Sequence, residues 1–329
     1  MIGVGCSSPR GGGVAIPTVS LAASTASTTF GASMTFTATP SVGFTPTSHR
    51  FEIIAGNTSQ VIIQVGNILN WTVNRLGSVT VTVVAVDATS SAVGSASTTV
   101  SEILANTDLL INNESLFNGA ATLPDATAIT SVSDQSGTSN DCNQATVARQ
   151  PRYYANEING LPAIRFGQTT ATHLYSTNSP TALMSTTIVF KPVGSGVANL
   201  MHIALSYNDG TDPLMIIYFN AGPQTAIYFR NVSGFINYGI TLSAAATHVI
   251  SVAAYSNKLV CFIDGSKVAE TTRTATNGGR TAVYVGGAYI GSYQGSIGHC
   301  ETQSRAISDT EIYEKQRVLA SKWGITLNN

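Results

Sequence analysis

The chain has 329 residues and a formal net charge of −1, and only 10% of its residues are charged. This length allows two or three domains of the usual size. The weak charge offers no electrostatic footprint for nucleic acid or an anionic membrane surface, so we exclude both as partners. No apolar run approaches the roughly 20 residues of a membrane-spanning helix, so we also expect no membrane span.

Residues 1–14 contain three consecutive glycines at positions 11–13 and are predicted to form a flexible arm. They lack the cationic start and apolar core of a secretory signal, so we expect synthesis in the cytoplasm without one. An arm of this kind is ordered only where something holds it. We expect it to dock on its own domain or on a neighbouring subunit.

Residues 15–102 are predicted to form an immunoglobulin-like β-sandwich. Apolar residues alternate with threonines over residues 34–38 and 79–83, which is the pattern of strands that bury one face. Turns separate about seven such strands, as expected for this fold, and Trp71 is expected in its core. The stretch resembles bacterial and phage immunoglobulin-like or PKD-like modules in residues 17–21, 77–83 and 94–100.

Residues 103–329 are predicted to form a second domain with longer strands, because the alternation of threonine and valine stops at its start. One helix is predicted at about 308–323. Ser308 and Glu311 have capping-box spacing, and Gly324 can end the helix. One helical face carries Ile312, Leu319 and Trp323. Both domains are otherwise all-β.

Several short motifs of the second domain occur in a recognisable order. They are Asp134-Gln-Ser-Gly137, Gln144, Arg149-Gln-Pro151, residues 159–166, Phe262-Ile-Asp-Gly265, Val285-Gly-Gly287, Gly295-Ser-Ile-Gly-His299 and Lys322-Trp-Gly-Ile325. Their order resembles that of the laminin-G-like domains of the concanavalin A-like lectin/glucanase superfamily, over about residues 108–329. The resemblance implies a two-sheet jelly roll that serves as a binding or structural module.

Two of these motifs are interpreted as structural turns. Asp134 is expected to accept backbone N–H bonds across the turn at Gly137, as aspartates do in Asx turns. The alternative is a calcium site completed by residues distant in the sequence, because Asp134 and Asp141 are too far apart for the alternating ligand pattern of a calcium loop. Asp264 and Gly265 lie between two strands and predict a tight hairpin.

Catalytic, metal and cofactor sites are not predicted. The E-x-D-x-E strand of glucanases is missing, and Glu301 stands alone. Residues 218–222 match one motif of jelly-roll alginate lyases, but the companion motifs of those enzymes are missing. The five histidines form no ligand pair, and the four cysteines lack zinc spacing, which favours free thiols.

Tyrosines are the candidate ligand contacts, because their rings stack on sugar faces and their hydroxyls form hydrogen bonds. They cluster in the second half of the chain, where Tyr207 and Tyr284 also lie. The ordinary alternative is that tyrosine is simply common in strands. The candidates are Tyr218, Tyr228, Tyr238, Tyr289 and Tyr293.

These observations favour a non-enzymatic structural or adhesive protein of a tailed-bacteriophage virion, either a head decoration or a tail or fibre component. Its partners are expected to be other virion proteins, bound through the arm, and host cell-surface glycans, with the chain forming a homo-oligomer at the virion surface. The alternative is a carbohydrate-binding module or adhesin fragment of a bacterial surface protein. A polysaccharide lyase or hydrolase is the third reading.

Overall fold

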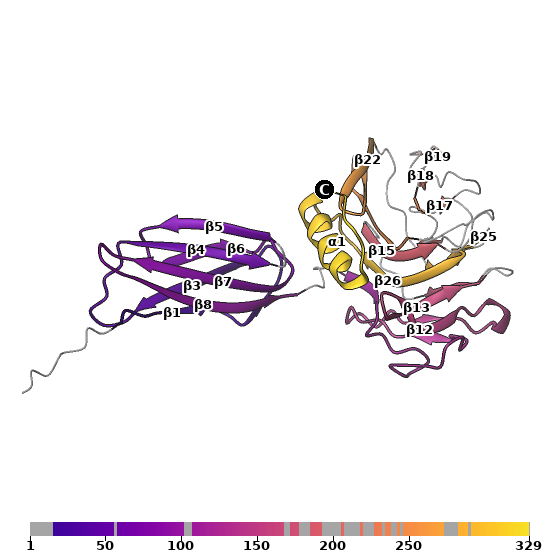
Figure 1. The fold of residues 1–329 in the computed structure, drawn as a ribbon. Helices are drawn as coiled ribbons and strands as arrows, with labels where there is room; N and C mark the ends of the chain where they lie inside the picture. The colour runs from indigo at the N-terminus through magenta and orange to yellow at the C-terminus, as the bar shows by residue number, and fades with distance from the viewer. Residues whose placement is uncertain are drawn as a thin grey trace, which may run out of the picture. The chain divides into compact units, whose positions relative to one another are not determined.

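The computed structural model describes residues 16–55, 58–101, 107–167, 172–177, 185–192, 205–206, 218–219, 227–231, 234–237, 242–243, 246–272, 282–288 and 291–328. The chain divides into two compact units, Met1–Ser101 and Glu102–Asn329, next to the boundary expected at residue 102. The predicted arm lies outside the described residues. Figure 1 shows strands throughout both units and an α-helix near the C-terminus, which is the one α-helix of the described residues. The all-β prediction is confirmed.

The first unit is a sandwich of two sheets. One sheet has the strand order β1 (Val19–Ala23), β3 (Ser33–Pro40), β6 (Ile68–Thr72). The other has the order β2 (Ser27–Thr28), β8 (Ser91–Val100), β7 (Gly77–Val86), β4 (Ser48–Ala55), β5 (Thr58–Gln64). The alternation along β7 buries Val79, Val81 and Val83. Trp71 lies in the core as predicted, with its ring 6.4 Å from that of Phe36.

The second unit is also built on two sheets. The larger has the order β12 (Arg152–Ile158), β13 (Leu161–Phe166), β26 (Gly295–Gln303), β15 (Ser185–Pro192), β20 (His248–Ala254), β21 (Lys258–Ile263), β22 (Ser266–Thr272), with β9 (Thr107–Ile111) also paired to β26. The smaller has the order β10 (Ser131–Val132), β11 (Cys142–Asn143), β14 (Leu174–Ser176), β23 (Ala282–Val285), β16 (Leu205–Ser206). Side chains from both sheets form one core between them, including Leu174, Val283, Ile188, Ile250 and Cys300.

Shorter elements complete the second unit. They are the 3₁₀ helix η1 (Val147–Arg149), a three-stranded sheet of β17 (Tyr218–Phe219), β18 (Ile227–Asn231) and β19 (Gly234–Asn237), and the pair β24 (Gly287–Ala288) and β25 (Gly291–Ser292). The cysteines of the described chain, Cys142, Cys261 and Cys300, are free and buried. The expectation of free thiols is confirmed for these three.

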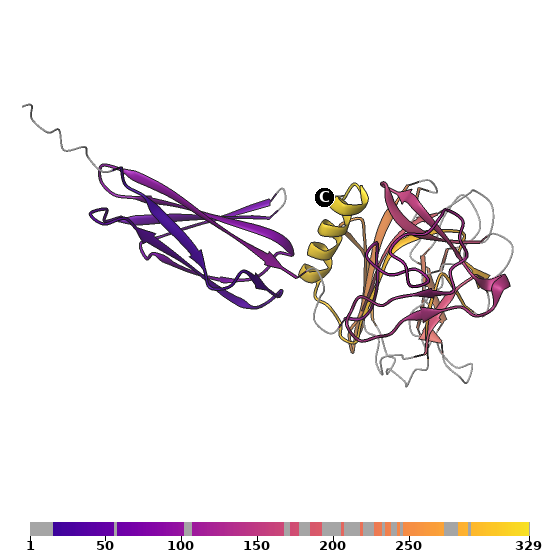
Figure 2. The same ribbon diagram turned by 90° about the horizontal axis from the view of Figure 1, so that it is seen from below.

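Helix α1 (Asp309–Trp323) covers the face of the larger sheet that points away from the core (Figures 1 and 2). The capping box of Ser308 and Glu311 forms, and Gly324 ends the helix in a left-handed conformation. Leu319 and Trp323 pack on Val189 and Val249 of the sheet. A Cβ at Gly298 would lie 2.4 Å from the Trp323 ring, so this glycine makes room for the indole. No helix of the described chain is long and apolar enough to cross a membrane.

Candidate functional site

The outer face of the smaller sheet carries a row of side chains that the core does not use. Strand alternation turns Leu174, Val283 and Val285 into the core. It therefore turns the residues between them, Tyr175 and Tyr284, to the opposite face. Both tyrosines are partly exposed.

Four residues stand opposite one another in this row, one from each of four neighbouring strands. Ser131 pairs with Asn143, Asn143 with Tyr175, and Tyr175 with Tyr284. The two tyrosine rings are stacked, with centroids 5.9 Å apart and planes inclined by 28°. Ser131 and Asn143 have short polar side chains. The row therefore has two aromatic rings at one end and a hydroxyl and an amide at the other.

His173 completes the aromatic group beside this row. Its ring centroid lies 5.5 Å from that of Tyr284 and 6.2 Å from that of Tyr175. The backbone of His173 is held on both sides, since its N–H donates to the Arg149 carbonyl at 3.1 Å and its carbonyl accepts from Gln144 Nε2 at 3.0 Å. Gln144, one of the motif residues, is buried and fixes this corner of the sheet.

The loop from Asp134 to Asp141 connects the two strands that carry Ser131 and Asn143. Asp134 accepts backbone N–H bonds from Leu110, Ser136 and Asn140 at 2.8, 2.9 and 3.0 Å. Burial raises the pKa of its carboxyl, but the hydrogen bonds from Ser136, Asn140 and Leu110 outweigh burial and leave the pKa lowered. Gly137 has a φ of 87°. The predicted structural turn is confirmed, and it borders the row.

The predicted ligand tyrosines lie elsewhere. Tyr218 and Tyr228 pair across β17 and β18, but the structure does not describe their side chains, while Tyr238 and Tyr289 lie outside the described residues. Tyr293 is fully buried, with its ring 6.3 Å from Phe166 and 6.5 Å from Phe190. The prediction that Tyr293 contacts a ligand at the surface is therefore wrong, because its ring serves the core.

The hairpin predicted at Asp264 and Gly265 is present, with φ angles of 47° and 86°. The Asp264 carboxylate also contacts His248, whose Nδ1 lies 2.6 Å from Oδ2. The other ring nitrogen of His248 lies 3.1 Å from the carbonyl oxygen of Ser243. Carboxylate and carbonyl oxygens only accept, so these contacts favour the protonated imidazole, in which both nitrogens donate. Burial lowers the pKa of His248, but Asp264 outweighs it and the net pKa is raised.

A second polar group lies beneath helix α1. Glu301 is fully buried and forms an ion pair with Lys315 of the helix. Its carboxylate also accepts from His299 Nε2 at 3.2 Å, Gln303 Nε2 at 2.7 Å and Thr107 Oγ1 at 3.0 Å. Glu301 thus has one ion-pair partner and three hydrogen-bond donors, and none of these partners is a second carboxylate.

The pKa values of this group follow from the ion pair. Burial raises the pKa of Glu301, but Lys315 and His299 outweigh it and hold that pKa at about 2. Burial lowers the pKa of His299, and the charge of Lys315 lowers it further, to about 4. At neutral pH the group thus consists of a carboxylate, an ammonium and a neutral imidazole.

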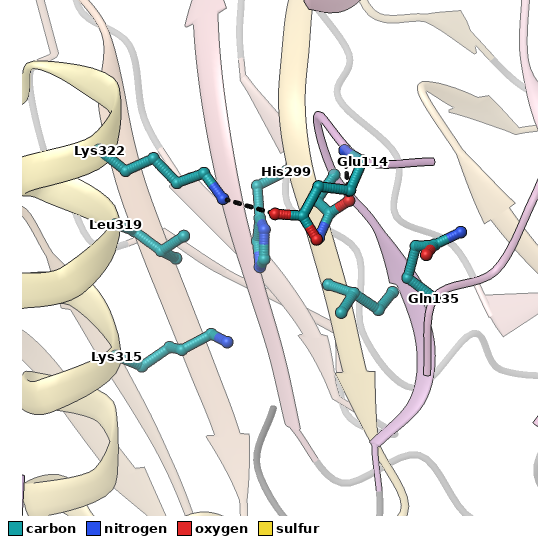
Figure 3. A pocket seen from close by; sticks show the side chains of 8 residues that line it. Glu114, Gln135, His299, Lys315, Leu319 and Lys322 are labelled. Carbon is teal, nitrogen blue, oxygen red and sulfur yellow. Dashed lines mark hydrogen bonds and ion pairs between the residues drawn. The ribbon is translucent and has the colours of Figure 1, made fainter. Parts of the chain in front are cut away.

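A pocket of about 160 Å³ opens above this group. Figure 3 shows Lys315, Leu319 and Lys322 projecting from α1 toward His299 and Glu114. Lys322 Nζ lies 3.9 Å from Glu114 Oε1, across the pocket. Each lysine thus faces a carboxylate, so the pocket offers no uncompensated charge to a ligand. The described residues contain no group of three or more His, Cys, Asp or Glu side chains arranged to hold a metal ion.

Comparison with known proteins places the chain by its fold. No family model matches it, and no curated protein sequence does. The sialidase of Trypanosoma rangeli in complex with sialic acid is 10% identical, over 92% of this chain and 53% of that one, with a TM-score of 0.50. The chain therefore spans about half the length of that sialidase.

Two further structures give lower TM-scores. Domain 4 of AbnA, a GH43 extracellular arabinanase of Geobacillus stearothermophilus solved with arabinotriose, is 13% identical over 56% of this chain and 92% of that one, with a TM-score of 0.43. The binding domain of botulinum neurotoxin serotype D is 11% identical over 68% and 54%, with a TM-score of 0.45. At such identities the likeness to the sialidase concerns the β fold alone.

Proposed function

We propose that the outer face of the smaller sheet binds carbohydrate, with Tyr175 and Tyr284 as its central contacts. The observation that carries this proposal is the stacked tyrosine pair, which continues across the strands into Asn143 and Ser131. Sugars present apolar C–H faces beside hydroxyl groups. A ring that borders an amide and a hydroxyl complements both features.

The loops that carry the residues of this row are held in place by hydrogen bonds to their main chain. Gln144 and Asp134 hold the loops that carry its residues through hydrogen bonds to the main chain. A contact surface that is ordered before the ligand arrives loses less conformational entropy on binding. The loops and turns therefore support recognition by a rigid platform.

The proposed role is non-enzymatic. The two groups best suited to acid–base chemistry are already engaged, since both nitrogens of His248 contact fixed oxygens and Glu301 is buried against Lys315. A general acid or base must reach the proton that it transfers. We therefore propose that both groups stabilise the fold. Binding is assigned to the row of Ser131, Asn143, Tyr175 and Tyr284, the tyrosine row.

The test is binding of the full chain to a glycan array, followed by titration of the best glycan. Tyr284→Ala is expected to weaken binding at least about tenfold, equivalent to about 1.4 kcal/mol, while Tyr175→Phe keeps the ring and loses less. Tyr154→Ala is the control, because Tyr154 is a partly exposed tyrosine that stacks under Arg165 at 4.0 Å on the other sheet. Absence of any bound glycan, or an equal loss with the control, would refute the proposal.

We also propose, from the resemblance of the sequence, that the second unit is a laminin-G-like module and that the protein is an adhesive component of a tailed-phage virion. The alternative, a carbohydrate-binding module of a bacterial surface protein, would use the same tyrosine row. Labelling of purified virions with an antibody to residues 108–329 separates the two. Label on the particle supports the virion role, and unlabelled particles reject it.

A further inference from the structure

Strand β5 forms one edge of the five-stranded sheet in the first unit, and one of its faces is apolar and exposed. It pairs with β4 on one side and ends the strand order. Val61, Ile63 and Val65 are 43%, 70% and 78% exposed. Alternate residues of a strand share a face, so Val61 and Ile63 form one apolar strip, and Val65 lies in the bend just after the strand.

This edge lacks the features that usually prevent strand pairing. Exposed edges are normally protected by charged residues, by proline or by bulges. Residues 58–65 contain neither a charge nor a proline, and the ladder from β4 to β5 runs without a bulge from His49 and Gln64 to Ala55 and Thr58. Among the described residues no strand pairs with the outer edge of β5, so its outward backbone groups can add another strand.

The sequence of β5 fits a second copy of itself. Gln60-Val-Ile-Ile-Gln64 reads almost identically in both directions about Ile62. Two antiparallel copies centred on Ile62 place Gln60 opposite Gln64 and Val61 opposite Ile63, which merges the two apolar strips. Such a pairing is isologous and has a two-fold axis.

The charges beside β5 are complementary in the same arrangement. On the neighbouring strand, Glu52 stands opposite Val61 and Arg50 opposite Ile63. In the paired sheets each cross-strand row begins with Glu52 of one copy, crosses Val61 and Ile63, and ends with Arg50 of the other. Within each copy Arg50 Nη1 lies 3.1 Å from Glu52 Oε2, so both flanks of the apolar strip are neutral ion pairs and no like charges face each other.

We propose that β5 is a homodimerisation edge, which joins the five-stranded sheets of two copies by antiparallel pairing about Ile62. The inference is independent of the proposed carbohydrate surface, since it uses a different unit of the chain. It assigns the first unit the task of presenting two copies of the second.

The first test is the mass of the full chain in solution by light scattering at micromolar concentration. The wild-type protein is expected to have twice the monomer mass. Ile63→Lys places one lysine from each copy in the apolar strip and is expected to raise the dimer dissociation constant roughly 100-fold or more. Val93→Lys is the matched control, since Val93 is 67% exposed and shares the outer face of the same sheet through Val84 and Arg50.

The second test concerns register. Val61→Cys and Ile63→Cys proteins, each in a Cys6→Ser background, are mixed and oxidised. The proposal predicts a disulfide between the two different variants and little within either one. A monomeric or trimeric wild type, dissociation by Val93→Lys as well, or equal cross-linking within each variant would overturn it.

Discussion

Asp134 holds its loop through more donors than any neighbouring side chain. Beyond the three backbone N–H groups, the hydroxyls of Ser136 and Thr138 donate to its carboxylate at 2.6 and 3.0 Å. Two of the backbone donors lie in its own loop, whereas Leu110 lies on β9. The residue therefore ties the loop that borders the tyrosine row to the larger sheet.

Asp134→Ala is expected to lower the free energy of unfolding by roughly 2–4 kcal/mol, because it strands several partly buried donors. Urea denaturation of the full chain measures this. Asp125→Ala is the control, because Asp125 accepts a single backbone N–H, from Ala155 at 2.7 Å, and should cost about 1 kcal/mol. Equal effects of the two substitutions would show that the network at Asp134 adds nothing.

At the scale of elements, helix α1 and strand β26 meet through charged groups as well as through apolar packing. Trp323 and Leu319 supply the apolar contact, and Lys315 reaches Glu301 on the strand. A buried ion pair contributes little compared with a well-packed apolar pair, but removing one partner leaves a buried charge without compensation.

Lys315→Met is therefore expected to destabilise the protein by about 3–5 kcal/mol. Adding Glu301→Gln to this variant removes the unpaired charge, so the double variant is expected to regain a large part of the loss. Chemical denaturation of the two single variants and the double variant completes the cycle. If the double variant were as unstable as the sum of the single ones, Lys315 and Glu301 would not be coupled.

The sequence predicts the bounds of α1 well, but it does not predict which carboxylate pairs with Lys315 of this helix. Ser308, Glu311 and Gly324 mark the ends of the helix locally, which is why its bounds are predicted closely. Lys315 falls on the same helical face as Ile312 and Leu319, and a lysine there signals a buried counter-ion. Which carboxylate meets it depends on how the helix docks on the sheet, and local patterns do not carry that information.

Local sequence patterns also fail to predict the tyrosine row. The Asp134 and Asp264 turns are local and are predicted correctly, because aspartate and glycine at such positions have few other uses. Tyr175 and Tyr284 become neighbours only through the pairing of β14 with β23, strands about a hundred residues apart in the chain. Choosing tyrosines by their local density instead selected Tyr293, which belongs to the core.

At the scale of the whole molecule, each unit has its own core, so two separate unfolding transitions are expected. The second unit contains two histidines whose pKa values shift in opposite directions. The pKa of His299 is lowered to about 4 from its usual value of 6.5, whereas that of His248 is raised. These shifts make the stability of the second unit depend on pH on both sides of pH 6.5.

Below pH 6.5 the unfolded chain takes up a proton at His299 while the folded unit resists it until about pH 4. This lowers the free energy of unfolding as the pH falls, by on the order of 3 kcal/mol once pH 4 is reached. Above pH 6.5 the folded unit keeps the proton of His248 longer than the unfolded chain does, so that stabilisation is lost as the pH rises through the raised pKa. The free energy of unfolding of the second unit is therefore expected to be highest near pH 6.5.

Calorimetry of the full chain from pH 4.5 to 8 tests this with one variant for each side. His299→Gln keeps a donor for Glu301 and should flatten the acid side alone, while His248→Gln should flatten the alkaline side alone. The range stops at pH 4.5 because Glu301, whose pKa is held at about 2, begins to contribute below that pH. If both variants kept the wild-type profile, the pH dependence would have to come from groups other than these two buried imidazoles.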